Sequence, residues 1–211
     1  PQEFNLLANQ AQMEILNQYF YDINQWSRQH GSNHEYADML DLINEKIAIF
    51  NVRASNVLVV NGVLPIIGNT LLPFEVYKLG SVALQSKTSS AEIEEVTHNE
   101  WLYMTTPLTR ASLSHPVYVN RIDGLNIYPG EINAVEISYV KVPNTVEWAY
   151  VVVNDKALYN DNISVDFELH ASEETELVYK ILKLAGLNLK QPEVIQVAEA
   201  MESGQIKQEK I

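Results

Sequence analysis

The stretch Val165–Gly186, VDFELHASEETELVYKILKLAG, decides how the rest of the chain is interpreted. It places a histidine, glutamates, a serine and a threonine directly before an apolar helical pattern. Such a cluster is either a catalytic or metal-binding site, or a joint at which a strand leads into a helix. The two interpretations predict different classes of protein, an enzyme or a structural component.

The residue pattern favours the joint. Val165, Phe167 and Leu169 alternate with acidic residues, which predicts a half-buried strand. From Leu177 onward the apolar residues recur at helical spacing. Gly186 follows the last of these turns, at the position where a left-handed C-cap is expected.

The polar residues of the joint are explained by the start of the helix. Ser172 is a good N-cap residue, and Glu173 and Glu174 fall in the first turn, where the helix dipole stabilises each carboxylate by ~0.3–1 kcal/mol. His170 and Glu174 could bind a metal ion together, but a tight site needs three or four convergent ligands. We therefore expect a structural role for this cluster.

Composition bounds the function classes. The chain has 211 residues, 46% of them hydrophobic, which is typical of a globular protein. The chain has no cysteine, so the sequence excludes disulfides and thiolate metal sites. Its net charge of -13 argues against binding to nucleic acid, because an acidic protein repels phosphates. No apolar run approaches the ~20 residues of a membrane helix. Because the chain opens on Pro1, we expect residues ahead of it.

Two amphipathic helices are predicted in the first 52 residues, separated by a break at Gly31 and Asn33. A short connection predicts that they pair antiparallel. Their apolar faces comprise Phe4, Leu7, Ala11, Ile15, Tyr19 and Ile23 in the first helix and Tyr36, Met39, Leu40, Ile43, Ile47 and Phe50 in the second.

The middle of the chain predicts short strands joined by turns. Asn61-Gly62 and Asp123-Gly124 are typical of tight hairpins, and Pro73 and Pro129-Gly130 of further reversals. The run WAYVVV, residues 148–153, predicts another strand.

One short helix is expected within this β region. Thr97 and Glu100 have the spacing of a capping box, which predicts a helix over Thr97–Met104.

The C-terminal part predicts a second helical pair. Its last helix opens at Gln191-Pro192 and runs to about Ser203, with Gly204 ending it. We therefore predict one α+β domain over residues 1–211. In this prediction a four-helix bundle forms from the two chain ends, residues 1–52 and 171–211, around a mostly antiparallel β insertion over residues 53–170.

No other group of residues predicts a reactive site. His30 and His34 are separated by a helix break, and YNDNISVD, residues 159–166, lacks the glycine and final glutamate of a calcium loop. Glu94 and Glu95 are neighbours on an extended run and so point to opposite faces. We expect no catalytic, cofactor-binding or metal-binding residue and no enzymatic activity.

Five segments carry a resemblance to known proteins. They are EFNLLANQAQMEILN, LPFEVYKLGSVAL, IEEVTHNEWLYM, PVYVNRIDGLNIYPGEINAVEISYVKVP and DFELHASEETELVYKILKLAGLNLKQPEVIQVAEAMESGQIKQEK. They resemble structural proteins of tailed phages that infect Bacteroidetes, the crAss-like group among them, and the resemblance covers most of the chain. More loosely, end helices around a β insertion resemble the head-to-tail adaptor, or tail tubular, proteins of short-tailed phages.

This resemblance implies a virion protein, made in the host bacterial cytoplasm, that forms a ring below the portal, usually twelvefold. Its implied partners are further copies of itself, the portal protein and other neck or tail proteins. Genomic DNA would pass through the ring without specific binding, and neither a membrane nor a cofactor is implied. Another tail, baseplate or minor capsid component, or a small hydrolase using Glu and His, remain as alternatives.

Overall fold

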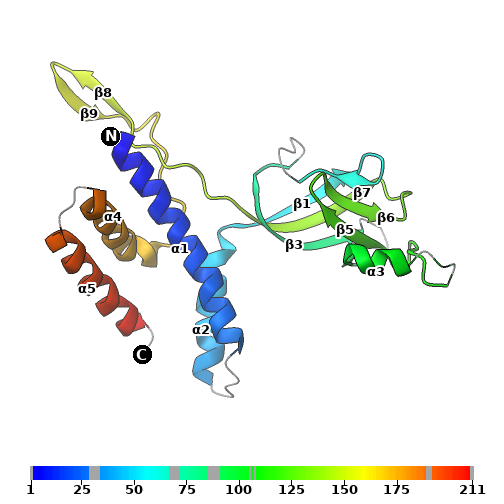
Figure 1. Ribbon diagram of the computed structural model, residues 1–211. Coiled ribbons are helices and arrows are strands. Elements are labelled where there is room, and N and C mark those ends of the chain that lie inside the picture. The colour runs from blue at the N-terminus through cyan, green and yellow to red at the C-terminus, as the bar shows by residue number, and fades with distance from the viewer. Residues whose placement is uncertain are drawn as a thin grey trace. The chain divides into compact units, whose positions relative to one another are not determined.

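The computed structural model describes residues 2–28, 34–66, 72–84, 91–104, 106, 108–188 and 192–209. The chain divides into two compact units (Figure 1). The helical unit contains Pro1–Ile49 and Pro143–Ile211, and the β unit contains Phe50–Val142. The β unit thus ends at Val142, whereas the expected β-rich insertion extends to residue 170.

Four long helices build most of the helical unit: α1 (Gln2–Arg28), α2 (His34–Ala48), α4 (Glu174–Asn188) and α5 (Pro192–Glu209). A single 3₁₀ turn, η1 (Ala171–Glu173), precedes α4. Helix α1 packs against both α2 and α4, and α4 packs against α5 (Figure 1). The buried apolar residues of these helices are Ala8, Ala11, Ile15, Leu16, Tyr19, Ile43, Ile47, Leu177 and Ala198.

The prediction of a four-helix bundle is wrong. The helices form successive pairs, α2–α1, α1–α4 and α4–α5, instead of closing around one shared core. Phe4 is 40% exposed, and Phe50 lies beyond the end of α2, at the first position of the β unit. Helical periodicity identifies an apolar face but not which neighbour covers it, and this is why the prediction failed.

The β unit holds two sheets among its described residues. The first has the order β1 (Asn51–Leu58), β7 (Ala134–Lys141), β3 (Val76–Leu84), and all of its pairs are antiparallel. The second has the order β2 (Val63–Leu64), β6 (Gly124–Tyr128), β5 (Val117–Arg121), β4 (Glu94–Glu95). Only β4 and β5 pair in parallel among these strands. Their shared core contains Val82, Tyr118, Leu125, Ile127, Val135, Ile137 and Tyr139.

The predicted turns of the β unit are confirmed. Asn61 and Gly62 both have positive φ, 54° and 77°, between the bridged residues Val60 and Val63. This turn joins β1 of one sheet to β2 of the other. At the second hairpin, Gly124 has φ 131°, and a Cβ there would meet the Leu64 carbonyl oxygen at 2.2 Å. Only glycine fits such a close approach.

The predicted short helix is confirmed as α3 (His98–Tyr103). Thr97 is its N-cap, with both bonds of the capping box present. The Glu100 carboxylate accepts from the Thr97 N–H at 2.7 Å, and the Glu100 N–H donates to the Thr97 hydroxyl at 3.3 Å. The carboxylate's bonds to Thr97 lower the pKa of Glu100.

The β unit begins and ends at adjacent points of one sheet. Asn51 is paired with Val140, and the Lys141 N–H donates to the Phe50 carbonyl at 2.9 Å. The chain therefore leaves the helical unit and returns to it across a single strand pair.

Two details of the opening stretch correct the prediction. Residues 165–169 do not form a strand, because only Val165 makes a bridge, to Glu147. Gly186 is buried inside α4, which continues to Asn188, and α5 likewise continues through Gly204 to Glu209. Packing of α4 against its neighbours outweighs the helix-ending tendency of glycine.

Candidate interaction site

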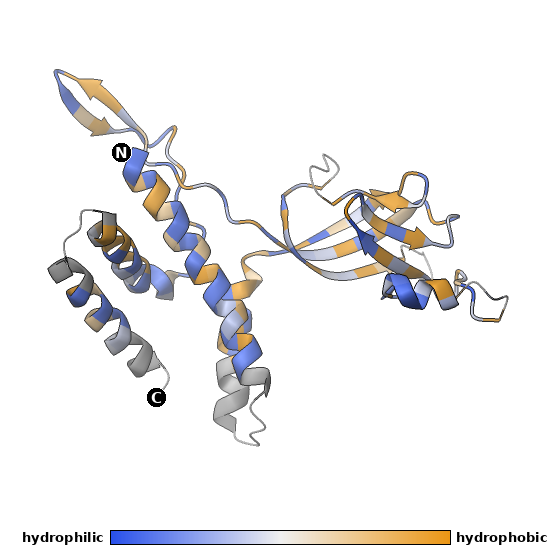
Figure 2. Cartoon of the chain, in the orientation of Figure 1, coloured by the Kyte–Doolittle hydropathy of each residue, from blue (hydrophilic) through white to orange (hydrophobic). Residues whose placement is uncertain are grey.

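A short hairpin is the most exposed apolar element of the helical unit. It consists of β8 (Tyr150–Val153) and β9 (Lys156–Tyr159), which we call the arm. Every residue of both strands is exposed, and Figures 1 and 2 show the arm extending past the N-terminal end of α1 with hydrophobic residues along both strands. Exposed fractions are 43% for Tyr150, 47% for Val151, 60% for Val152, 47% for Val153, 53% for Leu158 and 51% for Tyr159.

The register of the arm gives it two different apolar faces. Tyr150 is opposite Tyr159 and Val152 is opposite Ala157, so these four side chains share one face. The other face carries Val151 opposite Leu158 and Val153 opposite Lys156. A soluble sheet normally exposes a polar face, so an arm that is apolar on both faces indicates a contact surface.

The tip and base of the arm are well ordered by local chemistry. Asn154 and Asp155 have positive φ, 52° and 58°, the conformation of a type I′ hairpin turn. At the base, Trp148 stacks on Tyr150 with ring centroids 5.7 Å apart and lies 6.3 Å from Tyr159. The aromatic group stiffens the arm where it joins the helical unit.

Carboxamide side chains of α1 hold the extended segment that leads into the arm. Asn9 bonds both polar groups of Val146, accepting from its N–H at 2.7 Å and donating to its carbonyl at 3.0 Å. Asn5 accepts from the Trp148 N–H at 3.0 Å. These side chains satisfy the hydrogen-bonding backbone groups of a segment that has no neighbouring strand to pair with them.

Gln12 extends this row of carboxamides. It is 2% exposed, donates to the Asn144 carbonyl at 2.9 Å and accepts from the Glu168 N–H at 3.0 Å. It therefore ties the segment before the arm to the segment after it. These residues were not predicted from the sequence. Their signal is the recurrence of amide side chains at positions 5, 9 and 12, at helical spacing beside an apolar face.

The returning segment is fixed in the same way. Ser164 accepts from the Ala149 N–H at 3.1 Å and donates to the Asn160 carbonyl at 2.8 Å. Glu147 and Val165 exchange two backbone bonds. Residues 161–163 form a turn between β9 and Val165.

The predicted His170–Glu176 cluster has structural partners, but they differ from those expected. The N-cap of η1 is His170, whose ring accepts from the Ser172 N–H, so Ser172 is not the cap. Glu173 is 1% exposed and forms an ion pair with Lys46 of α2. The carboxylate therefore joins two helices instead of simply facing the dipole of its own helix.

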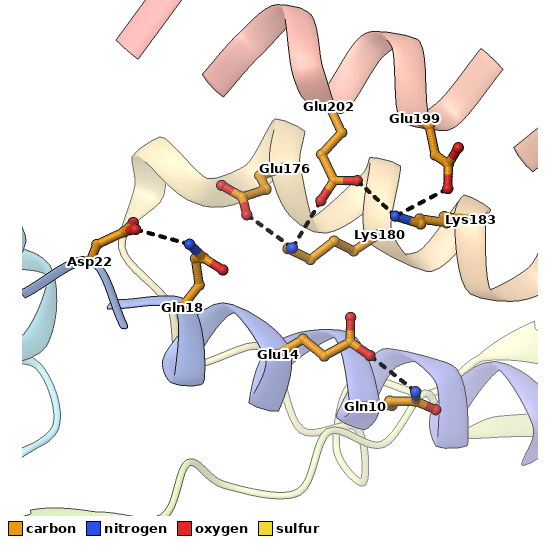
Figure 3. A network of polar contacts seen from close by, with 9 residues as sticks. All are labelled: Gln10, Glu14, Gln18, Asp22, Glu176, Lys180, Lys183, Glu199 and Glu202. Carbon is orange, nitrogen blue, oxygen red and sulfur yellow. Dashed lines mark hydrogen bonds and ion pairs between the residues drawn. The ribbon is translucent and has the colours of Figure 1, made fainter. Parts of the chain in front are cut away.

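A network of charges connects α4 and α5 (Figure 3). Lys180 lies 3.3 Å from Glu176 and 3.0 Å from Glu202, and Lys183 lies 3.4 Å from both Glu199 and Glu202. Desolvation opposes the charged form of Lys180, but bonding to Glu202 and Glu176 outweighs it and raises the pKa. Desolvation likewise opposes the charge of Glu202, and Lys180 and Lys183 outweigh it and lower the pKa. The network is an ion-pair contact between two helices.

The other predicted positions do not come together. His30 lies outside the described residues, and only the backbone of His34 is described, in α2. Glu94 and Glu95 are both exposed on β4, and Glu95 accepts from the Tyr118 hydroxyl at 3.2 Å. Burial, with Glu95 and Glu92 nearby, raises the pKa of Tyr118 to about 12.

Trp148 lies at the base of the arm, whereas the aromatic residues Trp26, Tyr118 and Tyr128 lie elsewhere. Tyr118 is 4% exposed and belongs to the β-unit core, and Tyr128 stacks on Trp101 at 3.7 Å. Trp26 lies within α1, and its side chain is outside the described set.

Two searches of the described parts of the chain gave negative results. They contain no group of three or more histidine or carboxylate residues placed to hold a metal ion. None of the helices among them has the length and apolar character needed to cross a membrane.

No protein-family model matches the chain, and a search of curated proteins returned no significant match.

Proposed function

We propose that this chain is a virion structural protein that forms a head-to-tail adaptor ring below the portal and continues the DNA channel. The observation that carries the proposal is the arm, which presents apolar side chains on both faces from a firmly held base. An isolated two-stranded hairpin is marginally stable in water, so such an arm is useful chiefly where a neighbouring subunit covers it. A protein built to assemble needs surfaces of this kind.

The charge of the chain agrees with a role beside passing DNA. A net charge of -13 repels phosphates, so a channel lined by this protein would let DNA move without being held. In this proposal DNA is cargo rather than ligand. The partners are further copies of the chain, the portal protein and other neck or tail proteins, and the protein performs no catalysis.

The experiment that tests the proposal is to locate the chain in the particle. Cryo-electron microscopy of the phage neck should place it in a closed ring on the DNA axis, directly below the portal. Native mass spectrometry of the purified protein, alone and with the portal protein, should give a closed oligomer that matches the portal. A location in a fibre, the baseplate or the capsid surface would refute the adaptor role and favour another virion component.

A further inference from the structure

The aliphatic face of the arm has the dimensions to pack along a helix. Val151 and Val153 lie two residues apart on a strand, about 6.6 Å. An exposed apolar strip on α4 consists of Val178 and Leu182, 47% and 46% exposed, which are one helical turn apart, about 6 Å. Because the two spacings agree, both valines can contact the strip at once.

Charge fixes the direction of this contact. Lys156 shares the aliphatic face with Val153, beside the tip of the arm. Glu174 lies one turn before Val178 at the start of α4. If Val153 packs on Val178 and Val151 on Leu182, the Lys156 ammonium lies next to the Glu174 carboxylate. The opposite direction would leave this pair apart, so one orientation is preferred.

The balance of charge also favours a second copy as the occupant. Within residues 148–160 the charged side chains are Asp155 and Lys156, which cancel, whereas the whole chain carries -13. Two copies of an acidic protein repel, and the arm lets them meet without adding to that repulsion. The three half-exposed apolar side chains of the aliphatic face, Val151, Val153 and Leu158, offer on the order of 250 Å², about a third of the roughly 800 Å² that each partner contributes to a standard interface.

We infer that the arm of one copy packs its Val151–Val153–Leu158 face on the Val178–Leu182 strip of a second copy, an inference that rests on the self-assembly proposed above. The two surfaces differ, so the contact is heterologous. Each copy gives an arm to one neighbour and receives an arm from the other, which is the arrangement that a ring requires.

The lack of native cysteine makes cross-linking a clean test. The double variant Val151→Cys/Leu182→Cys should form, under mild oxidation, a ladder of covalent dimers, trimers and larger species, because every copy has both halves of the contact. A mixture of the two single variants should stop at dimers. The matched control is Val152→Cys/Leu182→Cys, which places the thiol on the opposite face of the arm and should link at least about tenfold less.

Three outcomes would overturn the inference. Dimers of Val151→Cys alone would show that arms pair with each other. An internally linked monomer of the double variant would show that the arm folds back on its own copy. Sedimentation of the wild-type protein with anionic lipid vesicles, lost in Val151→Asp, would show that the arm enters a membrane.

A charge substitution gives a second, independent measurement. Val151→Asp should weaken subunit association at least about a hundredfold, because a carboxylate would be buried next to the apolar side chain of Leu182. Asn162→Asp adds the same charge close to the base of the arm and should change association less than about threefold. Equal effects of the two variants would refute an apolar contact through the arm.

These results are separable from the proposed function. A neck ring that assembles normally with Val151→Asp, and gives no cysteine ladder, would refute the arm contact and leave the adaptor role standing. A cysteine ladder from a protein found away from the neck would support the arm contact and refute the adaptor role.

Discussion

The clearest energetic prediction concerns Asn9, which holds the segment leading into the arm. The substitution Asn9→Leu keeps the size of the side chain and removes both of its bonds to Val146, at 2.7 and 3.0 Å. Each bond contributes about 0.5–1.5 kcal/mol net, and each backbone group left dry costs about 1–3 kcal/mol. Val146 is 4% exposed, but exposed Thr145 and Glu147 flank it, so water can reach part of the gap. We expect a loss of about 2–3 kcal/mol in the free energy of unfolding.

Urea denaturation followed by far-ultraviolet circular dichroism measures this loss, and amide hydrogen exchange locates it. The amides of Val146 and Trp148 should exchange faster in the variant, whereas the amide of Ile137, in the β unit, should not change. The matched control is Gln10→Leu, also on α1, whose amide bonds only the exposed Glu14 and which should change stability by less than about 0.5 kcal/mol. An Asn9→Leu variant as stable as the wild type, or one whose extra exchange spreads evenly over the molecule, would refute the anchoring role.

Four further predictions concern other contacts. Lys180→Met should destabilise the protein by about 2–4 kcal/mol at neutral pH, because it leaves the partly buried carboxylates of Glu176 and Glu202 without their closest cation. The pKa of Glu202 is lowered on folding, so its stabilising contribution is present above the usual pKa range of a glutamate and is lost as the pH falls through the lowered pKa of the folded state. Urea midpoints plotted against pH should therefore fall less steeply on the acid side in Lys180→Met than in the wild type. Gly124→Ala should cost more than about 2 kcal/mol in thermal or urea unfolding, since the new Cβ would meet the Leu64 carbonyl, and a neutral result would disprove the close approach. Thr97→Ala should cost about 1 kcal/mol through loss of the capping box, and Thr97→Ser should restore most of it. Chelator should leave the melting temperature unchanged; a metal found at one ion per chain by elemental analysis would contradict the structural role of the His170 cluster.

Local signals in the sequence predicted local structure well. The long helices, the capping box at Thr97 and the turn at Asn61-Gly62 depend on residues close in sequence, and all are present. Two errors in the opening stretch, the strand at residues 165–169 and the C-cap at Gly186, have another origin. Val165–Leu169 alternates like a strand, but only Val165 is bridged, because a strand needs a partner along its length. Gly186 predicts the end of the helix, but packing keeps it within α4.

The contact surface could be predicted only in part. WAYVVV identified a strand, but the sequence does not say that both of its faces stay exposed, since that depends on whether a third strand or a helix covers them. The anchoring amides of α1 bond residues more than 130 positions away. No pattern of neighbouring residues indicates such partners. The bundle failed for the same reason, since apolar faces of helices are interchangeable until packing distinguishes them.

The way in which the β unit joins the chain has a consequence for how this protein could have arisen and how it can be altered. Phe50 and Lys141 are hydrogen-bonded neighbours, so excising residues 50–142 leaves two ends that a few glycines can bridge. The β unit can therefore be deleted, or exchanged for another β domain with adjacent termini, without changing the connectivity of the helices. A related protein with the same helical unit could therefore bind different partners if its β unit were replaced, while the arm and its anchoring residues stayed unchanged.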